Sequence, residues 1–155
     1  MDTFAYKSNN MKKIILLLCL IIGYNAYSQQ LNTDKSNNAL QMYDAVGYHQ
    51  SYAIKGKEEF KYSYKGAIYY FFSMSNKKAF IANPEKYLPA YGGWCAYAMG
   101  YDGSLVEIDP TSYKVIDGKT YLFYKSVFND TREKWNKDEK NLKSKADKNW
   151  TKYQK

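Results

Sequence analysis

Residues 60–72 read FKYSYKGAIYYFF. Every second residue from Phe60 to Tyr64 is aromatic and the residues between them are polar, which is the two-residue period of a β-strand. Lys65-Gly66 then signals a turn. The run that follows, 67–72, is apolar on both faces, which is typical of a strand covered on both sides. The stretch therefore predicts an antiparallel hairpin whose second strand is central.

The segment after this hairpin predicts a helix packed on it. Ser73 or Ser75 is placed to cap a helix over 76–82, because serine side chains accept hydrogen bonds from free backbone amides at helix starts. Asn83-Pro84 ends that helix, since the residue before a proline avoids helical angles.

A second hairpin and a helix are predicted in the last third of the chain. Residues 113–124 read YKVIDGKTYLFY, in which Asp117-Gly118 separates two strand-like runs and favours a type I′ turn. The tail from Asp130 predicts one long helix with an apolar stripe formed by Trp135, Leu142, Ala146, Trp150 and Tyr153. Together these elements predict an α+β fold: a small single domain of antiparallel hairpins with packed helices and a long C-terminal helix.

The N-terminal residues have the features of a signal peptide. Lys12 and Lys13 precede an apolar run over 14–22, and small residues stand before a cleavage point after Ser28. A helix that crosses a bilayer needs about 20 residues, so this run is too short to be a stable span. We expect residues 1–28 to be removed, with Met11 as a second candidate start, and the protein to be periplasmic or secreted.

The composition after the signal peptide indicates a flexible leader followed by one domain. Residues 29–41 are polar and rich in asparagine, which predicts a leader without fixed structure, so the domain is expected over 42–155. The whole chain carries 23 Lys and Arg against 15 Asp and Glu, a formal net charge of +8. Such a charge suits anionic lipid or nucleic acid, and export argues against nucleic acid.

Cysteine usage points to one unusual residue. Cys19 lies in the predicted signal peptide, so Cys95 is alone in the exported chain and cannot form an internal disulfide. No glycine-rich phosphate loop and no paired carboxylates stand out in the sequence. We therefore assign no catalytic residue and do not expect an enzyme.

Several segments carry a family pattern: YDAV (43–46), KGKEEF (55–60), NPEKYLPAYGGWCAYA (83–98), DGKTYLFY (117–124) and ADKNW (146–150). Together they resemble the YHS domain, in particular its small secreted, (seleno)protein-like subgroup. The wider family occurs in copper-transporting ATPases, and the resemblance implies metal binding through cysteines. This chain departs from that pattern, because the three cysteine positions are Gly47, Phe72 and Asn76 here. Copper binding along those positions does not carry over.

Three interpretations of Cys95 stay open. In the first, Cys95 and Met99, four residues apart on a short helix expected over 94–99, bind a soft metal ion such as Cu(I), with His49 as the third ligand. The predicted partner is then that metal ion or a small ligand close to Cys95.

The other two interpretations need no metal. In the second, Cys95 lies in the first turn of the helix after two glycines, where free amides favour the thiolate, and it exchanges with an external thiol. In the third, Cys95 is a small buried thiol in a non-catalytic interaction module of the cell envelope.

Overall fold

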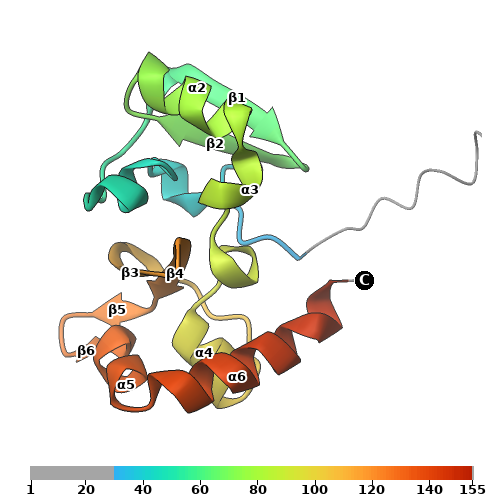
Figure 1. Cartoon of the computed structure of the whole chain (residues 1–155), viewed down its shortest axis with the longest axis vertical. Helices are drawn as coiled ribbons and strands as arrows, with labels where there is room; N and C mark the ends of the chain where they lie inside the picture. The colour runs from blue at the N-terminus through green and yellow to red at the C-terminus, as the bar shows by residue number, and fades with distance from the viewer. Residues whose placement is uncertain (1–29, 155) are drawn as a thin grey trace, which may run out of the picture.

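The computed structural model describes residues 30–154 and consists of two lobes stacked along its long axis (Figure 1). The first lobe (residues 43–88) holds β1 (Lys57–Tyr64), β2 (Ala67–Phe71), α2 (Met74–Ala82) and α3 (Pro84–Tyr87). The second lobe (residues 90–154) holds α4 (Ala96–Tyr101), β3 (Asp109–Ile116), β4 (Lys119–Phe123), β5 (Lys125–Ser126), β6 (Asn129–Asp130), α5 (Thr131–Lys137) and α6 (Glu139–Trp150). The described chain also contains four short 3-10 helices: η1 (Leu40–Met42), η2 (Gly47–Gln50), η3 (Ala90–Gly93) and η4 (Thr151–Tyr153). The α+β class, with antiparallel hairpins and a C-terminal helix, is confirmed.

The first predicted hairpin is present. β1 and β2 pair antiparallel up to Tyr64 and Ala67, on either side of the Lys65-Gly66 turn. The other edge of β2 is occupied by residues 37–39, which exchange two backbone hydrogen bonds with Ile68. β2 is therefore central, as its apolar composition indicated.

Helix α2 packs on this hairpin through Phe80. The Ser73 hydroxyl caps the helix by accepting the Asn76 amide at 3.2 Å, so the helix begins at Met74, two residues before its expected start. The ring of Phe80 is buried, with its centroid 4.9 Å from that of Tyr69 and 5.1 Å from that of Phe71. Aromatic side chains of the hairpin thus form the core of the first lobe.

The second predicted hairpin is β3 with β4. Asp117 and Gly118 have φ of 49° and 71°, as a type I′ turn requires at both central positions.

The long C-terminal helix is broken in two, contrary to the prediction. Asp138 (φ −147°) ends α5 and precedes α6, and its carboxylate accepts the Asn141 side-chain amide at 2.7 Å. Aspartate favours such a position because its side chain competes for polar groups that a continuous helix would use internally. The apolar stripe itself is confirmed by four buried members: Trp135, Leu142, Ala146 and Trp150.

Tyr48 on η2 joins the two lobes. Its buried hydroxyl donates to the carbonyl of Pro110 at 3.0 Å, and its ring centroid lies 4.8 Å from that of Tyr113 on β3. Burial raises the pKa of Tyr48 far above its ordinary value, so the hydroxyl stays a neutral donor.

Residues 30–41 correct the prediction of a flexible leader. The Asn32 amide donates to the carbonyl of Gly92 in the second lobe at 2.9 Å, and the Ala39 amide donates to β2 in the first lobe at 2.9 Å. Ala39 and Leu40 are buried. A polar composition predicted disorder, but here the polar backbone and side chains find fixed partners in the folded domain.

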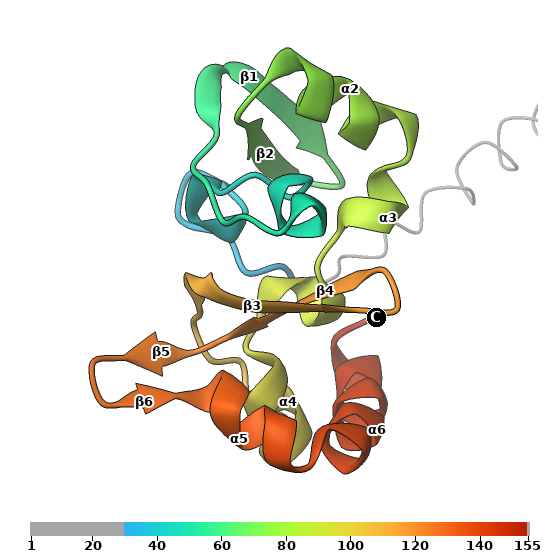
Figure 2. The same cartoon turned by 60° about the vertical axis from the view of Figure 1, so that its left-hand side comes forward.

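A small hairpin, β5 with β6, was not predicted. It projects from the second lobe beside α5 (Figure 2). Its connecting residues, Val127 and Phe128, carry none of the usual turn chemistry, which is why the sequence did not reveal it.

The predicted signal peptide, residues 1–28, lies outside the described residues. Within residues 30–154, no helix combines the length and the apolar character that a membrane crossing requires.

Candidate functional site

Cys95 is the N-cap residue of α4 and not part of its first turn. The helix begins at Ala96, two residues later than expected, and Cys95 has a non-helical ψ of 115°. The Cys95 amide donates to the carbonyl of Val106 at 3.0 Å. Its own backbone also forms a parallel bridge with Leu122 on β4. The Cys95 side chain accepts no capping hydrogen bond from the amides of this six-residue helix, so that ground for a reactive thiolate is lost.

The sulfur of Cys95 is enclosed and has both of its polar contacts inside the protein. Cys95 is 0% exposed. Its Sγ accepts the backbone amide of Tyr124 at 3.2 Å and lies 3.5 Å from the hydroxyl of Thr131. The Thr131 hydroxyl donates its one proton to the Tyr124 carbonyl at 2.9 Å, so the thiol is the donor toward Thr131. This arrangement suits a structural thiol.

Met99 is one helical turn after Cys95, but it is part of a different hydrophobic cluster. Cys95 packs with side chains such as Leu122 and Ile108, which belong to the cluster that extends into the first lobe. Met99 packs with Phe123 and Trp135 in the cluster of the second lobe. Both are fully buried.

His49 lies at the interface of the lobes. Its Nε2 is 3.2 Å from the hydroxyl of Thr120, and its ring meets the edge of Tyr87 with centroids 5.0 Å apart. Burial, followed by the charges of Lys86 and Lys119, holds the pKa of His49 below its ordinary value of 6.5. A neutral imidazole is the form that binds metals, but its neighbours here are a hydroxyl and an aromatic ring.

The strand β4 separates His49 from the Cys95 sulfur. His49 contacts Thr120, whereas the sulfur contacts the amide of Tyr124, four residues further along the chain. At 3.3 Å per residue these two points lie roughly 13 Å apart. Two ligands of one ion, each bound at about 2.0–2.3 Å, lie within about 4.5 Å of one another. The structure does not bring His49 and Cys95 together, and the set of Cys95, Met99 and His49 stays a prediction without support from this arrangement.

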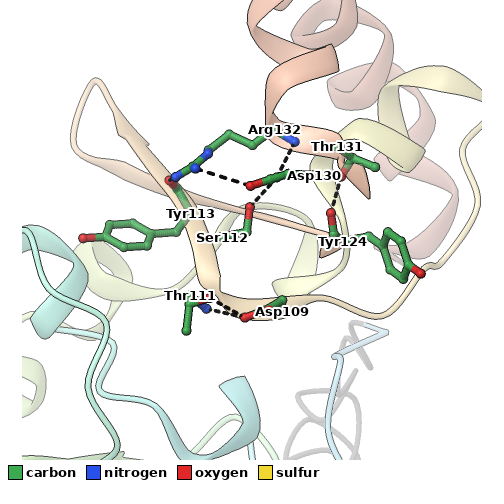
Figure 3. Close-up of polar contacts among 8 residues, drawn as sticks. All are labelled: Asp109, Thr111, Ser112, Tyr113, Tyr124, Asp130, Thr131 and Arg132. Carbon is green, nitrogen blue, oxygen red and sulfur yellow. Dashed lines mark hydrogen bonds and ion pairs between the residues drawn. The ribbon is translucent and has the colours of Figure 1, made fainter. Parts of the chain in front are cut away.

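A polar network next to Cys95 anchors the start of α5 (Figure 3). Asp130 accepts the Ser112 hydroxyl at 2.7 Å and caps the helix by accepting the Arg132 amide at 2.9 Å. Its second oxygen receives the Arg132 guanidinium at 3.3 Å. All these contacts are internal, so Asp130 positions the chain and leaves no carboxylate oxygen free for acid–base chemistry.

Asp109 lies at the start of β3 in the same view. Burial raises the pKa of its carboxyl, but hydrogen bonds from the Thr111 amide and hydroxyl, at 2.8 and 2.7 Å, outweigh burial and hold the pKa below its usual value. A carboxylate so stabilised is a poor proton acceptor near neutral pH. Neither Asp109 nor Asp130 has the features of a general base.

A second polar cluster, which the sequence did not predict, surrounds the buried carboxylate of Asp44. One oxygen accepts the amides of Val46 and Gly47 at 2.8 and 3.2 Å. The other accepts the Phe72 amide at 2.8 Å and the Asn76 side-chain amide at 2.7 Å. Asp44 is thus satisfied by four donors from three segments. The sequence contained one local signal for this cluster. An aspartate side chain commonly accepts the backbone amide two residues later in a turn, as Asp44 does from Val46.

Two grooves adjoin where the N-terminal segment meets residues 107–111. Their volumes are about 370 and 540 Å³, and both are lined by Gln41 and Ile108. The Gln41 side-chain amide donates to the Ile108 carbonyl at 2.8 Å between them. Residues 40–42 all have positive φ, an unfavourable conformation for side chains other than glycine. These grooves are two of the concave surfaces on which a small polar ligand could bind.

Residues 49–91 match the YHS domain. No curated protein and no solved structure matches the chain. YHS domains are linked in general to metal binding. The matched range begins at His49 and ends before Cys95 and Met99, so the likeness to the small secreted subgroup, which rested on residues beyond this range, stays a prediction.

The residues at the family's cysteine positions do not fit a soft metal ion. Gly47, Phe72 and Asn76 gather around Asp44 and supply two amides from the backbone and one from a side chain. A side chain at position 47 would have its Cβ only 2.8 Å from the ring of Tyr52. Cu(I) prefers thiolate ligands. These positions instead supply N–H groups that donate hydrogen bonds to the carboxylate of Asp44. Within residues 30–154, moreover, no three His, Cys, Asp or Glu side chains are grouped to hold a metal.

Proposed function

We propose that this chain is an exported, non-catalytic module of the cell envelope built on a YHS domain, with Cys95 as a structural thiol. The observation that carries the proposal is the sulfur atom itself, in a residue that is 0% exposed and with its donor and acceptor roles both used inside the fold. Reactive cysteines, by contrast, are partly exposed and lie close to positive charge.

Two further features support a non-catalytic role. The carboxylates of Asp44 and Asp130 are fully engaged by internal donors. The one histidine of the chain, His49, faces a hydroxyl and an aromatic ring at the lobe interface. Export is supported by the signal-like pattern of residues 1–28.

Thiol accessibility tests the structural role of Cys95. The full chain with Cys19→Ser, treated with an aromatic disulfide reagent, should react by less than a tenth of an equivalent when folded and by one equivalent in denaturant, because the sulfur is enclosed. A Cys95→Ser control of the same chain should not react in either condition. Rapid reaction of the folded protein would favour the redox interpretation instead.

Metal analysis separates this proposal from the copper interpretation. Protein purified under native conditions from the exported fraction should carry no stoichiometric copper, and its intact mass should show cleavage after Ser28 and no adduct on Cys95. One copper ion per chain, lost in both Cys95→Ser and Met99→Leu, would instead establish a metal site at that pair. Retention of residues 1–28 in the purified protein would contradict export by cleavage.

A further inference from the structure

The tip of the β5–β6 hairpin exposes two large apolar side chains. Val127 is 90% exposed and Phe128 is 99% exposed, the two highest values among the large hydrophobic residues of the described chain. They connect Ser126 to Asn129, which pair with each other. The hairpin projects from the second lobe, away from the two hydrophobic clusters (Figure 2).

Turn geometry does not require these residue types. Tight hairpin turns favour Asn, Asp and Gly, and this chain uses Lys65-Gly66 and Asp117-Gly118 at its other two hairpins. A valine and a phenylalanine in water at such a turn gain nothing for the fold. Their presence therefore points to an environment outside the folded chain that covers them.

The base of the hairpin is held firmly. Lys125 pairs with Asp130 across it, and the carboxylate of Asp130 is fixed by Ser112 and Arg132. Just outside the hairpin, the Thr131 amide donates to the Tyr124 carbonyl at 3.0 Å (Figure 3). The apolar tip is thus presented by a pre-organised base.

Charge and size identify the partner surface. Lys125 is exposed, whereas Asp130 is turned inward with its side chain 11% exposed and bound to Arg132, so the hairpin presents a positive charge beside its apolar tip. The chain as a whole carries +8. A protein interface of ordinary stability covers about 800 Å² on each partner, far more than two side chains on a convex tip supply. Apolar residues that enter the acyl region below a flanking lysine are typical of attachment to anionic bilayers.

We propose that the hairpin tip docks this protein on an anionic lipid surface, with Val127 and Phe128 inserted among the lipids and Lys125 at the headgroups. Tyr124, partly exposed and next to Lys125, lies at the headgroup level. The inference goes beyond the proposed function, and its apolar tip and flanking charge, Val127, Phe128 and Lys125, are not among the polar contacts of the Cys95 sulfur.

Vesicle binding of the full chain tests the proposal. Vesicles of phosphatidylglycerol and phosphatidylethanolamine should bind the protein, and the double variant Val127→Ser, Phe128→Ser should bind at least about tenfold more weakly. Tyr101→Ser is the matched control, because Tyr101 is 70% exposed on α4 and remote from the tip, and its affinity should stay within about twofold. Lys125→Gln should weaken binding to these vesicles and leave binding to phosphatidylcholine vesicles unchanged.

A reporter at the tip separates this contact from binding by any other part of the chain, including residues 1–29, which all variants share. The emission of Phe128→Trp should shift to the blue on addition of anionic vesicles and be quenched by brominated acyl chains, whereas Tyr101→Trp should show neither effect. If the protein sediments with the vesicles but the emission of Phe128→Trp does not change, the proposal is overturned. A blue shift that appears without lipid as protein concentration rises would also overturn it, since a second copy of the chain would then cover the tip.

Discussion

His49 contacts both lobes through one imidazole ring. It approaches Thr120 of β4 and the ring of Tyr87 at the end of α3. Burial and the nearby charges of Lys86 and Lys119 disfavour its protonated form. As the single histidine of the chain, it makes the pH dependence of stability near neutrality simple to interpret.

We expect the free energy of unfolding to fall as pH drops below about 6.5. The pKa of His49 is lower in the folded protein than in the unfolded chain, so between the two values the unfolded state binds more protons and stability rises with pH. The loss should begin at the unfolded pKa and level off once the pH is below the folded pKa. Urea titrations at pH 7.5, 6.5, 6.0 and 5.5 would measure it.

A His49→Gln variant is the control for this prediction. It keeps a polar side chain opposite Thr120 but has no group that titrates in this window, so its stability should vary less between pH 7.5 and 5.5. An NMR titration of the imidazole that gives a pKa above 6.5 would contradict the assigned direction.

At the scale of elements, Gly100 sets the distance between α4 and α6. A Cβ at this position would lie 2.5 Å from the carbonyl oxygen of Leu142 and 3.0 Å from its carbonyl carbon. Backbone atoms of a packed helix cannot move aside as a flexible side chain can. The contact explains a glycine inside a helix, where the residue is otherwise unfavourable by about 1 kcal/mol relative to alanine.

Gly100→Ala should therefore destabilise the protein by about 1 kcal/mol or more, despite alanine's better helix propensity. The comparison is Ser144→Ala on the exposed face of α6, which gains helix propensity without a clash and should leave stability unchanged or slightly higher. Urea unfolding of both variants measures the difference. Equal or greater stability of Gly100→Ala would show that α4 and α6 are less closely packed than described.

At the scale of the whole molecule, residues 30–41 tie the two lobes together. The Gln30 amide donates to Tyr153 near the C-terminus and the Asn32 amide to Gly92, while Ala39 joins the edge of β2. The segment thus closes contacts between residues more than a hundred positions apart in sequence.

Removal of this segment should lower the stability of both lobes. A chain that begins at Met42 should be less stable than one that begins at Gln30 by at least about 3 kcal/mol, because it loses the buried side chain of Leu40 and several backbone hydrogen bonds. Differential scanning calorimetry of the two chains gives the comparison. Equal midpoints would restore the interpretation of residues 30–41 as a flexible leader.

Local sequence signals were sufficient for most elements of this fold, although they revealed neither the β5–β6 hairpin nor the break between α5 and α6 at Asp138. The alternation from Phe60 to Tyr64, the Asp117-Gly118 turn and the Ser73 cap depend on residues a few positions apart, and each forms as predicted. The spacing of apolar residues in the C-terminal region likewise identified the buried stripe around Trp135. Propensity and periodicity act over such short ranges, and the tertiary structure did not override them here.

Long-range contacts decided the rest. The partners that enclose the Cys95 sulfur, Tyr124 and Thr131, are 29 and 36 residues away, and the donors of Asp44 come from as far as Asn76. No local pattern reveals which side chain meets which across such distances, so the sequence left a metal-bound, a reactive and a buried Cys95 open and predicted a disordered polar leader. The physical reason is that burial and hydrogen-bond satisfaction are properties of the packed chain, whereas turns, caps and strand alternation belong to neighbouring residues.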